Sequence, residues 1–441
     1  MSEYPSFPDN LYVHRRDDKV LLFNPDVPAW LVTNANGHAI LSLFDGTHSV
    51  DEVVEAFCVV HGENLRQALA EFLHKAVATG IFDRPRPGET PILATCYRLS
   101  ALQLSISARC NLNCRYCYAT DRVEQGARKM TLDDYRRLLD DVKALTPSLR
   151  LTLTGGEPLL NRDCFAIARY ARDKGFFVDM LTNGTLIGED NIDSIKDSFD
   201  EIRISLDGST AELHERFRGQ GSYLPVMHAL ALLDSREVPY SLSMTVNRLN
   251  IHDLPAMAAK YGSRLNFAPL FPAGNAKQGE DISITGREYF QALKAAAGVT
   301  PLSYCGSSLD NARQCRNCKC SIGDSSLSLS PTGDLYPCHL LHYPRFLIGN
   351  VLQTPLGELY RSSAVIERCR HLTVDNVEGC RDCFLRYVCG GACRARAFHE
   401  GGDLAATSDF CEYERLAYID GLFSLYSRNA LSSPFPITVN Q

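Results

Sequence analysis

Three cysteines lie close together in the chain, at Cys110, Cys114 and Cys117, with the spacing C-x3-C-x2-C. They follow an apolar, strand-like run at 102–106. A tight loop after a strand can bring three thiolates onto three irons of a four-iron cluster. The fourth iron then has no protein ligand. This loop therefore predicts an iron–sulfur cluster with one open coordination position.

A second group of cysteines occupies the last third of the chain, in the order C-x12-G-x4-C, then C-x2-C-x5-C-x3-C, then a final C. Its members are Cys320, Cys338, Cys380, Cys383, Cys389, Cys393 and Cys411. The chain has 17 cysteines and no export signal, so metal ligands are more plausible than disulfides. A zinc ribbon built from the middle four thiolates is an alternative, but it would leave three of these cysteines unexplained.

The composition is that of an ordinary globular protein of two or three domains. The chain has 441 residues, of which 45% are hydrophobic and 22% are charged. The net charge of -7 argues against sequence-independent binding of nucleic acid, which depends on Lys and Arg at the phosphates. No apolar run approaches the roughly 20 residues that span a bilayer. We therefore expect a cytoplasmic protein with no nucleic-acid and no membrane partner.

The first 92 residues indicate a small separate unit. The expected elements are a β-hairpin, two helices and a returning strand, at 10–13 with 20–23, 49–58, 65–80 and 81–82. Ser49 and Glu52 form a capping box, and Gly80 is a helix stop. Together these elements describe a winged-helix-like domain, followed by a proline-rich linker.

From about residue 99 the chain alternates between strand and helix patterns, which is typical of the α/β class. The strand runs are 102–106, 151–154, 177–181, 202–206, 241–246 and 265–267, with helical patterns such as 131–144, 165–174 and 224–233 between them. Six β/α units are too few to close an eight-stranded barrel. We expect a partial (β/α)6 barrel at 99–295 and a cysteine-rich domain at 305–441.

Turn-forming and polar residues follow several of these strands. Gly155-Gly156-Glu157-Pro158 follows the second strand, Thr182-Asn183-Gly184 the third, and Ser205-Leu206-Asp207-Gly208 the fourth. Active sites of parallel sheets collect at the carboxyl ends of strands. These segments and the three-cysteine loop are therefore predicted to surround one active site.

The three-cysteine loop, with Tyr116 before its third cysteine, and the Gly-Gly-Glu-Pro segment together resemble the radical S-adenosylmethionine (SAM) enzymes. The resemblance implies that SAM chelates the open iron and is cleaved to a 5′-deoxyadenosyl radical. It also implies contacts to the amino, ribose and carboxylate groups of SAM. The residues that it assigns to these contacts are Gly155, Gly156, Glu157, Asn183, Ser205 and Arg218. A solvated helix end is the alternative reading of Arg218.

The seven-cysteine pattern is similar to the SPASM extension of the same enzymes. The resemblance implies two auxiliary [4Fe-4S] clusters. A distal cluster would be held by Cys380, Cys383, Cys389 and Cys411, and a nearer cluster by Cys320, Cys338 and Cys393. Cys315 has the spacing closest to that of a fourth ligand of the nearer cluster, while Cys318 and Cys305 compete with it.

The N-terminal unit resembles the peptide-recognition (PqqD-like) element of enzymes that mature ribosomally made peptides (RiPPs). Mixed charges on its last helix argue against DNA binding. In that family the leader of a precursor peptide adds as a strand to a sheet edge. The resemblance therefore implies a peptide maturase that takes hydrogen from an unactivated carbon and forms a carbon–sulfur or carbon–carbon crosslink. Its electron donor would be a flavodoxin or ferredoxin.

His339, directly after Cys338, is a candidate catalytic base or a residue packed beside a cluster. Formylglycine-forming enzymes of this family carry Asp at that position, so the His argues against that activity. Other readings of the chain are a maturase of a folded protein or a small metabolite, a peptide epimerase, and an iron–sulfur redox sensor.

Overall fold

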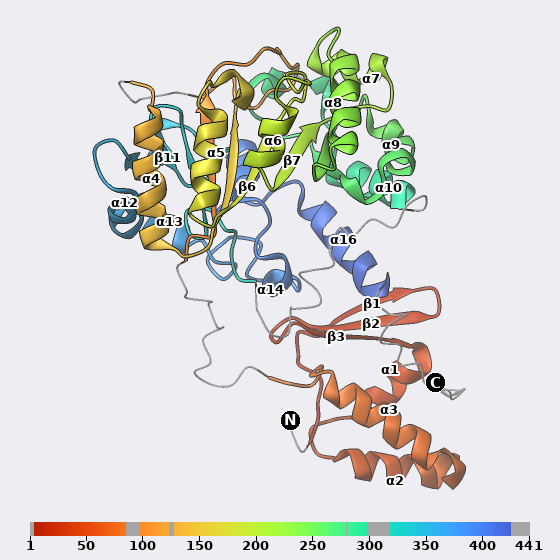
Figure 1. The fold of residues 1–441 in the computed structure, drawn as a ribbon. Helices are drawn as coiled ribbons and strands as arrows, with labels where there is room; N and C mark the ends of the chain where they lie inside the picture. The colour runs from red at the N-terminus through yellow and green to blue at the C-terminus, as the bar shows by residue number, and fades with distance from the viewer. Residues whose placement is uncertain (1–3, 85–97, 123–127, 279, 298–316, 425–441) are drawn as a thin grey trace.

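The computed structural model describes residues 4–84, 98–122, 128–278, 280–297 and 317–424. Figure 1 shows a large upper body built on a parallel sheet and a smaller N-terminal unit below it. Helix α16 (Cys411–Ser424) extends from the body towards the N-terminal sheet. Within the described residues, no helix has the length and apolarity needed to cross a membrane.

The N-terminal unit is a three-stranded antiparallel sheet covered on one face by helices. Its strands pair in the order β1-β2-β3. Their bounds, with those of the helices, are β1 Tyr12–Arg16, β2 Lys19–Asn24, β3 Ala29–Asn34, α1 Ala35–Leu41, α2 Val50–His61 and α3 Arg66–Ala78. The expected hairpin is β1 with β2, and Asp17 in its turn has a φ of 54°. The predicted capping box is present, because Ser49 and Glu52 exchange both hydrogen bonds.

Two details of this unit differ from the sequence prediction. Residues 81–82 form a turn, not a strand, because the carbonyl of Ile81 accepts a side-chain hydrogen bond from Asn24 at 3.0 Å. Phe82 is buried by stacking on Phe7 at a ring distance of 4.9 Å. Strand β3 was missed; it pairs with β2 along its whole length.

The body contains six parallel strands that pair in sequence order, which confirms the α/β class. They are β4 Ala101–Ser107, β5 Arg150–Gly155, β6 Phe177–Thr182, β7 Glu201–Ser205, β8 Tyr240–Val246 and β9 Leu265–Pro269. The helices of this part are α4 Leu132–Leu145, α5 Cys164–Asp173, α6 Ile192–Ser198, α7 Ala211–Arg218, α8 Tyr223–Ser235, α9 Leu254–Tyr261 and α10 Gly286–Ala297. Buried aliphatic side chains from strands and helices form one core between the layers.

The cysteine-rich part extends this sheet. Strand β10 (Ser326–Leu329) pairs in parallel with β4, and β11 (Asp334–Tyr336) and β12 (Gly349–Asn350) follow as antiparallel strands. The α-helices described in this region, besides α16, are α12 Leu356–Ser362, α13 Ala364–Arg370, α14 Arg386–Cys389 and α15 Arg394–Gly401. Because nine strands form one sheet, the two regions share a common framework.

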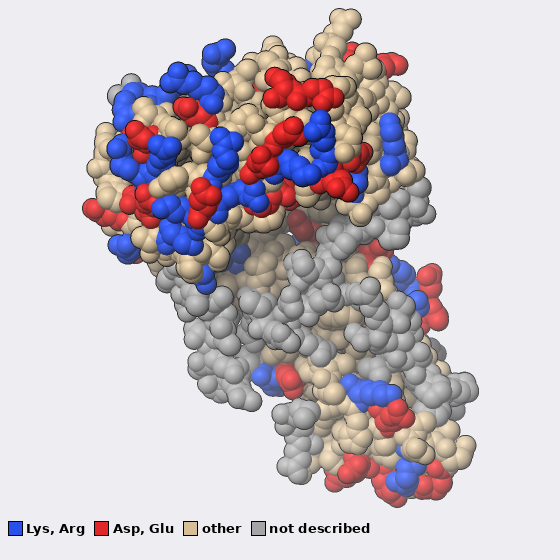
Figure 2. All heavy atoms as spheres, in the orientation of Figure 1, with Lys and Arg blue, Asp and Glu red and all other residues tan. Residues whose placement is uncertain are grey.

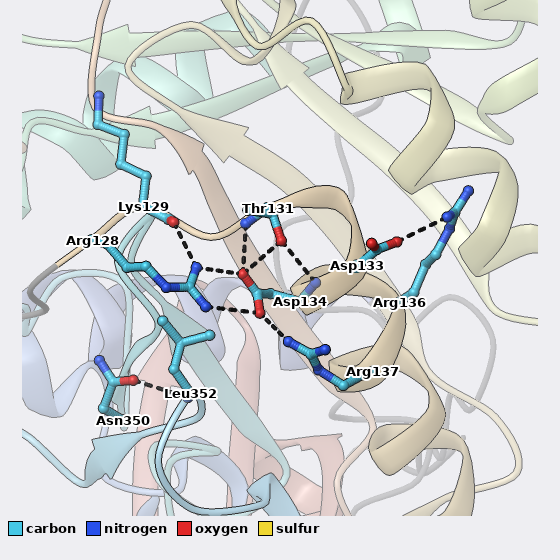
Figure 3. Close-up of polar contacts among 9 residues, drawn as sticks. All are labelled: Arg128, Lys129, Thr131, Asp133, Asp134, Arg136, Arg137, Asn350 and Leu352. Carbon is cyan, nitrogen blue, oxygen red and sulfur yellow. Dashed lines mark hydrogen bonds and ion pairs between the residues drawn. The ribbon is translucent and has the colours of Figure 1, made fainter.

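The start of α4 is held by a buried carboxylate (Figure 3). Asp134 forms a capping box with Thr131 and also accepts hydrogen bonds from Arg128, at 2.6 and 3.1 Å, and from Arg137. Its side chain is 1% exposed, whereas those of the two arginines are 53% and 71% exposed. Hydrogen bonds from Arg128 therefore hold the pKa of Asp134 below its usual value although burial opposes this.

Replacing Asp134 should destabilise the body of the protein. We expect Asp134→Ala to lower the free energy of unfolding by about 2 kcal/mol, since it removes a cap and leaves charged partners without their acceptor. The carboxylate stabilises the fold above its unfolded pKa of about 3.9, and this contribution is lost as the pH falls towards the lower folded pKa.

Urea unfolding of the full chain, followed by circular dichroism at pH 7 and pH 3, measures both effects. Asp133→Ala is the matched control, because the Asp133 side chain is 75% exposed and forms a surface ion pair with Arg136. Equal losses in the two variants would contradict the assignment.

Candidate active site and cysteine groups

The three-cysteine loop begins at the carboxyl end of β4, and its thiols lie close enough to affect one another. Burial raises the pKa of Cys114 to about 11; Arg218 lowers it, whereas Cys117 and Cys110 add to the rise. The sulfur of Cys110 accepts a hydrogen bond from the Leu112 amide at 3.4 Å. The three thiols thus stand on one loop within range of one another, and their binding of a cluster stays a prediction.

A second segment fixes the far side of this loop. The backbone N–H and side-chain amide of Asn275 donate to the carbonyls of Cys117 and Cys114, at 3.0 and 3.1 Å. Gly274 has a φ of +57°, and a Cβ there would lie 2.2 Å from the Cys117 carbonyl oxygen. Only glycine therefore allows the two backbones to approach this closely.

The glycines after β5 serve the same kind of close approach. A Cβ on Gly155 would lie 2.3 Å from the carbonyl oxygen of Ser107, and one on Gly156 would lie 2.3 Å from that of Arg109. The amides of Gly156 and Glu157 donate to these two carbonyls at 2.7 and 2.8 Å. The glycine pair thus packs directly on the backbone of the cysteine loop.

Glu157 is fully buried beside the loop and is almost saturated with donors. Its Oε1 accepts from the Thr182 hydroxyl at 2.8 Å and the Leu159 amide at 3.2 Å, and its Oε2 from the Asn183 amide at 2.9 Å. Burial raises the pKa of Glu157, although these hydrogen bonds oppose the rise. A carboxylate has about four acceptor positions, so one position on Oε2 is available for an ammonium group.

Asn183, directly after β6, links that strand to the cysteine loop. Its side-chain amide donates to the Asn111 carbonyl oxygen Oδ1 at 2.9 Å and reaches the Cys110 sulfur at 3.8 Å. Its Oδ1 accepts from the amide and hydroxyl of Thr185 at 2.9 and 2.7 Å. In the structure this side chain therefore supports the loop, and its contact to the ribose of SAM stays a prediction.

Arg218 is buried, which rules out the solvated helix end. Its Nε donates to the carboxylate of Asp207, which also accepts from the Tyr116 hydroxyl and, at 2.7 Å, from the Thr245 amide. Burial alone would lower the pKa of Arg218, but Asp207, Tyr116 and Cys114 together raise it by more. The guanidinium carbon lies 5.7 Å from the Tyr116 ring centre.

Asp207 was not singled out from the sequence, although it stands in the predicted turn after β7. Its side chain is 0% exposed and joins Arg218 and Tyr116 at the edge of the cysteine loop. The sequence signal that could have identified Asp207 is a carboxylate two residues beyond a buried strand.

Ser205 is the last residue of β7 and pairs in register with Ser243 of β8.

The C-terminal cysteines fall into two groups in space. Burial raises the pKa of Cys338, and Cys393 and Cys320 raise it further. Burial also raises the pKa of Cys380; Arg394 lowers it, and Cys411 and Cys383 raise it. Cys411 likewise raises the pKa of Cys389, after burial and Glu414. Cys393 thus influences Cys338, whereas Cys389 is influenced by Cys411, and the division into two clusters stays a prediction.

Three upstream cysteines were considered for a fourth ligand of the nearer group. Cys315 and Cys305 lie outside the described residues, and Cys318 is buried. Across the described ranges, no three His, Cys, Asp or Glu side chains are arranged to hold a single metal ion.

His339 lies between the cysteine loop and the nearer group. Its Nδ1 is 3.9 Å from the Cys338 sulfur, and its ring meets the Tyr118 ring edge-on at a centroid distance of 5.8 Å. Arg122 donates to the His339 carbonyl at 2.8 Å and lies over the Tyr118 ring. Burial, followed by Arg122, lowers the pKa of His339 to about 4.

Comparison with known proteins agrees with this geometry. Residues 104–260 match the radical SAM superfamily, and residues 320–384 match an iron–sulfur cluster-binding domain, SPASM. The chain therefore belongs to the radical SAM enzymes that carry a SPASM domain, and its cofactors are SAM and [4Fe-4S] clusters. The second match ends before Cys389, Cys393 and Cys411.

Individual relatives have different names. The AdoMet-dependent heme synthase of Methanosarcina barkeri is 26% identical over 345 residues, which is 72% of this chain and 96% of the relative. The PqqA peptide cyclase of Rhodopseudomonas palustris is 26% identical over 339 residues, or 70% and 86%. SuiB from Streptococcus suis, solved with S-adenosylmethionine and with its precursor peptide SuiA, has TM-scores of 0.55 and 0.53 at 13% and 14% identity. These likenesses cover 91% of this chain and 98% of SuiB.

Replacing Glu157 should weaken SAM binding. In Glu157→Gln the amide would face the Asn183 N–H and could offer no charge to an ammonium group, so we expect affinity to fall about tenfold, the cost of one charge-assisted hydrogen bond. Anaerobic equilibrium binding of SAM to the cluster-loaded chain measures the loss.

Glu189→Gln, whose carboxylate is 66% exposed, should bind SAM normally. Iron content is measured in parallel to verify that the cysteine loop is intact. Unchanged affinity of Glu157→Gln at full iron content would remove Glu157 from the SAM site.

Proposed function

We propose that this chain is a peptide maturase that acts on a ribosomally made precursor. The substrate carbon would lose a hydrogen atom, and an oxidation would then close a carbon–sulfur or carbon–carbon crosslink. The observation that carries the proposal is the N-terminal three-stranded sheet attached to a radical SAM and SPASM body. A sheet with an exposed outer strand can accept a peptide as a further strand.

The residues around the cysteine loop suit the binding of SAM. When bound, SAM and the reduced cluster supply the hydrogen-abstracting radical. We assign the cluster to Cys110, Cys114 and Cys117, and the amino group of SAM to Glu157 with the backbone of Gly155 and Gly156. Ser205, Asn183 and Arg218 stay our candidates for its ribose and carboxylate. Asp207 would hold Arg218 and Tyr116 in position.

The two C-terminal thiol groups suit two auxiliary clusters. We assign Cys380, Cys383, Cys389 and Cys411 to the distal cluster, and Cys320, Cys338 and Cys393, with Cys315 as candidate fourth ligand, to the nearer one. Closing a crosslink removes one hydrogen atom, one proton and one electron from the peptide. The auxiliary clusters would accept that electron, and His339 is our candidate for the group that accepts the proton.

Removing one thiol of the distal group should cost one cluster. We expect Cys411→Ala to lower iron from about twelve to about eight atoms per chain, because three four-iron clusters become two. Iron and sulfide analysis after anaerobic reconstitution measures this. Cys164→Ala, a buried cysteine outside both groups, should retain all the iron; a loss there and none in Cys411→Ala would contradict the assignment.

We assign leader recognition to the outer strand β3. β3 pairs only with β2 in the described sheet, whereas the other outer strand, β1, is flanked by α16 through the contact of His14 with Phe423 at 5.9 Å. A peptide strand could add to the outer edge of β3 by backbone hydrogen bonds. The SuiB likeness supports this proposal, since a match to 91% of this chain must include part of the N-terminal unit.

A tetrapyrrole or another small metabolite is the second candidate substrate. The name of the Methanosarcina relative favours it, and that likeness covers 72% of this chain. The two candidates differ in what the N-terminal sheet must do. A small-molecule enzyme would use the sheet only as a scaffold. A peptide maturase would lose its activity if leader binding were abolished.

The decisive experiment uses the product of a short open reading frame beside the gene for this chain. We expect anaerobic incubation with SAM and a reductant to yield 5′-deoxyadenosine and a peptide lighter by two hydrogens, detected by mass spectrometry. Unchanged mass with deuterium uptake from solvent would indicate an epimerase instead. 5′-Deoxyadenosine with an unmodified peptide would favour a small substrate, and none at all would refute radical chemistry.

A matched peptide tests the leader contact. N-methylation of alternate leader amides removes the donors that strand addition needs, so modification should be lost while the core sequence is unchanged. Methylation at the intervening positions, whose N–H groups point away from β3, should be tolerated. Equal modification of both peptides would contradict strand addition.

A further inference from the structure

We propose that the N-terminal sheet forms a wall that shields the distal auxiliary cluster from water and thereby sets its reduction potential, with Tyr12 stacked on Phe384 as the central contact. This inference rests on the assignment of the distal cysteines made above. It does not depend on whether the chain binds a leader peptide.

The two faces of the N-terminal sheet have different partners. One face, with Val20, Leu22 and Leu31, packs on the helices of its own unit. The opposite face packs on the cysteine-rich region. The buried residues of that second cluster are Leu21, Phe23, Val32, Leu385, Val388, Tyr418, Ile419, Leu422 and Phe423, and Cys383 and Cys389 pack against it. The sheet therefore covers two of the four proposed ligands of the distal cluster.

An aromatic contact lies at the centre of this interface. The rings of Tyr12 and Phe384 stack with centroids 3.5 Å apart and planes 5° from parallel. Phe23 meets Phe384 edge-on at 6.0 Å. Because Phe384 directly follows Cys383, the stack lies beside a proposed ligand. The pKa of Tyr12 is consistent with this position beside Cys383: burial raises it, Arg415 lowers it, and Cys383 raises it.

Ion pairs connect the N-terminal sheet to the body through α16. Asp420 on α16 is 7% exposed and accepts from Arg16 of β1 and from Lys294 of α10, both at 2.8 Å. The Arg16 guanidinium also lies 4.4 Å from the ring centre of Phe423. Since Cys411 is the first residue of α16, one helix joins a proposed ligand, the body and the N-terminal sheet. Figure 1 shows this helix crossing from the body to β1.

Shielding has a defined electrochemical consequence. A four-iron cluster gains one negative charge on reduction, and water stabilises the more highly charged state more strongly. A wall that excludes water therefore keeps the potential low. Opening the wall should raise the potential of the distal cluster and should leave the cluster of Cys110, Cys114 and Cys117 unaffected.

The test is an anaerobic redox titration of the reconstituted full chain, followed by electron paramagnetic resonance. The distal signal is identified by its absence from Cys411→Ala. We expect Tyr12→Ala to shift the midpoint of that signal upwards and to increase the rate of iron loss in air several-fold. Val13→Ala is the matched control, since Val13 is the next residue of β1 and is 38% exposed; it should match the wild type.

Two further variants separate shielding from unfolding. Tyr12→Phe retains the ring and should keep the wild-type potential, whereas Tyr12→Leu retains apolar cover and should give a smaller upward shift than Tyr12→Ala. A Tyr12→Ala midpoint equal to those of Val13→Ala and the wild type would overturn the proposal. If the variants show the expected shifts but the wild-type chain modifies no peptide, the maturase function is refuted and the shielding proposal stands.

Discussion

The structure depends on strand β4 being paired on both sides. Its carboxyl end starts the three-cysteine loop, its pairing with β5 brings the glycines against that loop, and its pairing with β10 attaches the cysteine-rich region. Parallel pairing aligns the carboxyl ends of neighbouring strands. One strand therefore sets the position of the radical-forming site relative to the sheet that continues towards the auxiliary thiols.

Two buried carboxylates organise the residues around the loop. Glu157 collects backbone and hydroxyl donors from β6, whereas Asp207 collects Arg218 and Tyr116. A buried charge is tolerated only when hydrogen bonds or an opposite charge compensate it. The compensation of Asp207 by Arg218 also places a positive charge near Cys114, where it favours the thiolate form. The contacts that compensate the buried charge thus also act on a proposed cluster ligand.

We propose two separate roles for the N-terminal unit. Its outer strand β3 would receive a peptide, and the face opposite its own helices packs on Cys383 and Cys389. These roles use different surfaces of a sheet that is only three strands wide. The two roles are nevertheless linked, since Val32 of β3 belongs to the cluster that packs on Cys383 and Cys389.

The sequence by itself determined the features that depend on local pattern. The six parallel strands, the capping box at Ser49 and the radical SAM and SPASM motifs were predicted from residue periodicity, capping residues and cysteine spacing. The strand predicted at 81–82 was wrong. These residues are apolar because they pack in the core, but they do so from a turn.

Only the tertiary structure decided which distant residues meet. Asp207 meets Tyr116, which lies 91 positions away in sequence, and the pairing of β10 with β4 joins residues more than 200 positions apart. The same holds for the stack of Tyr12 on Phe384. Spacing and periodicity act over a few turns of chain, whereas long-range packing and buried charge depend on the whole fold.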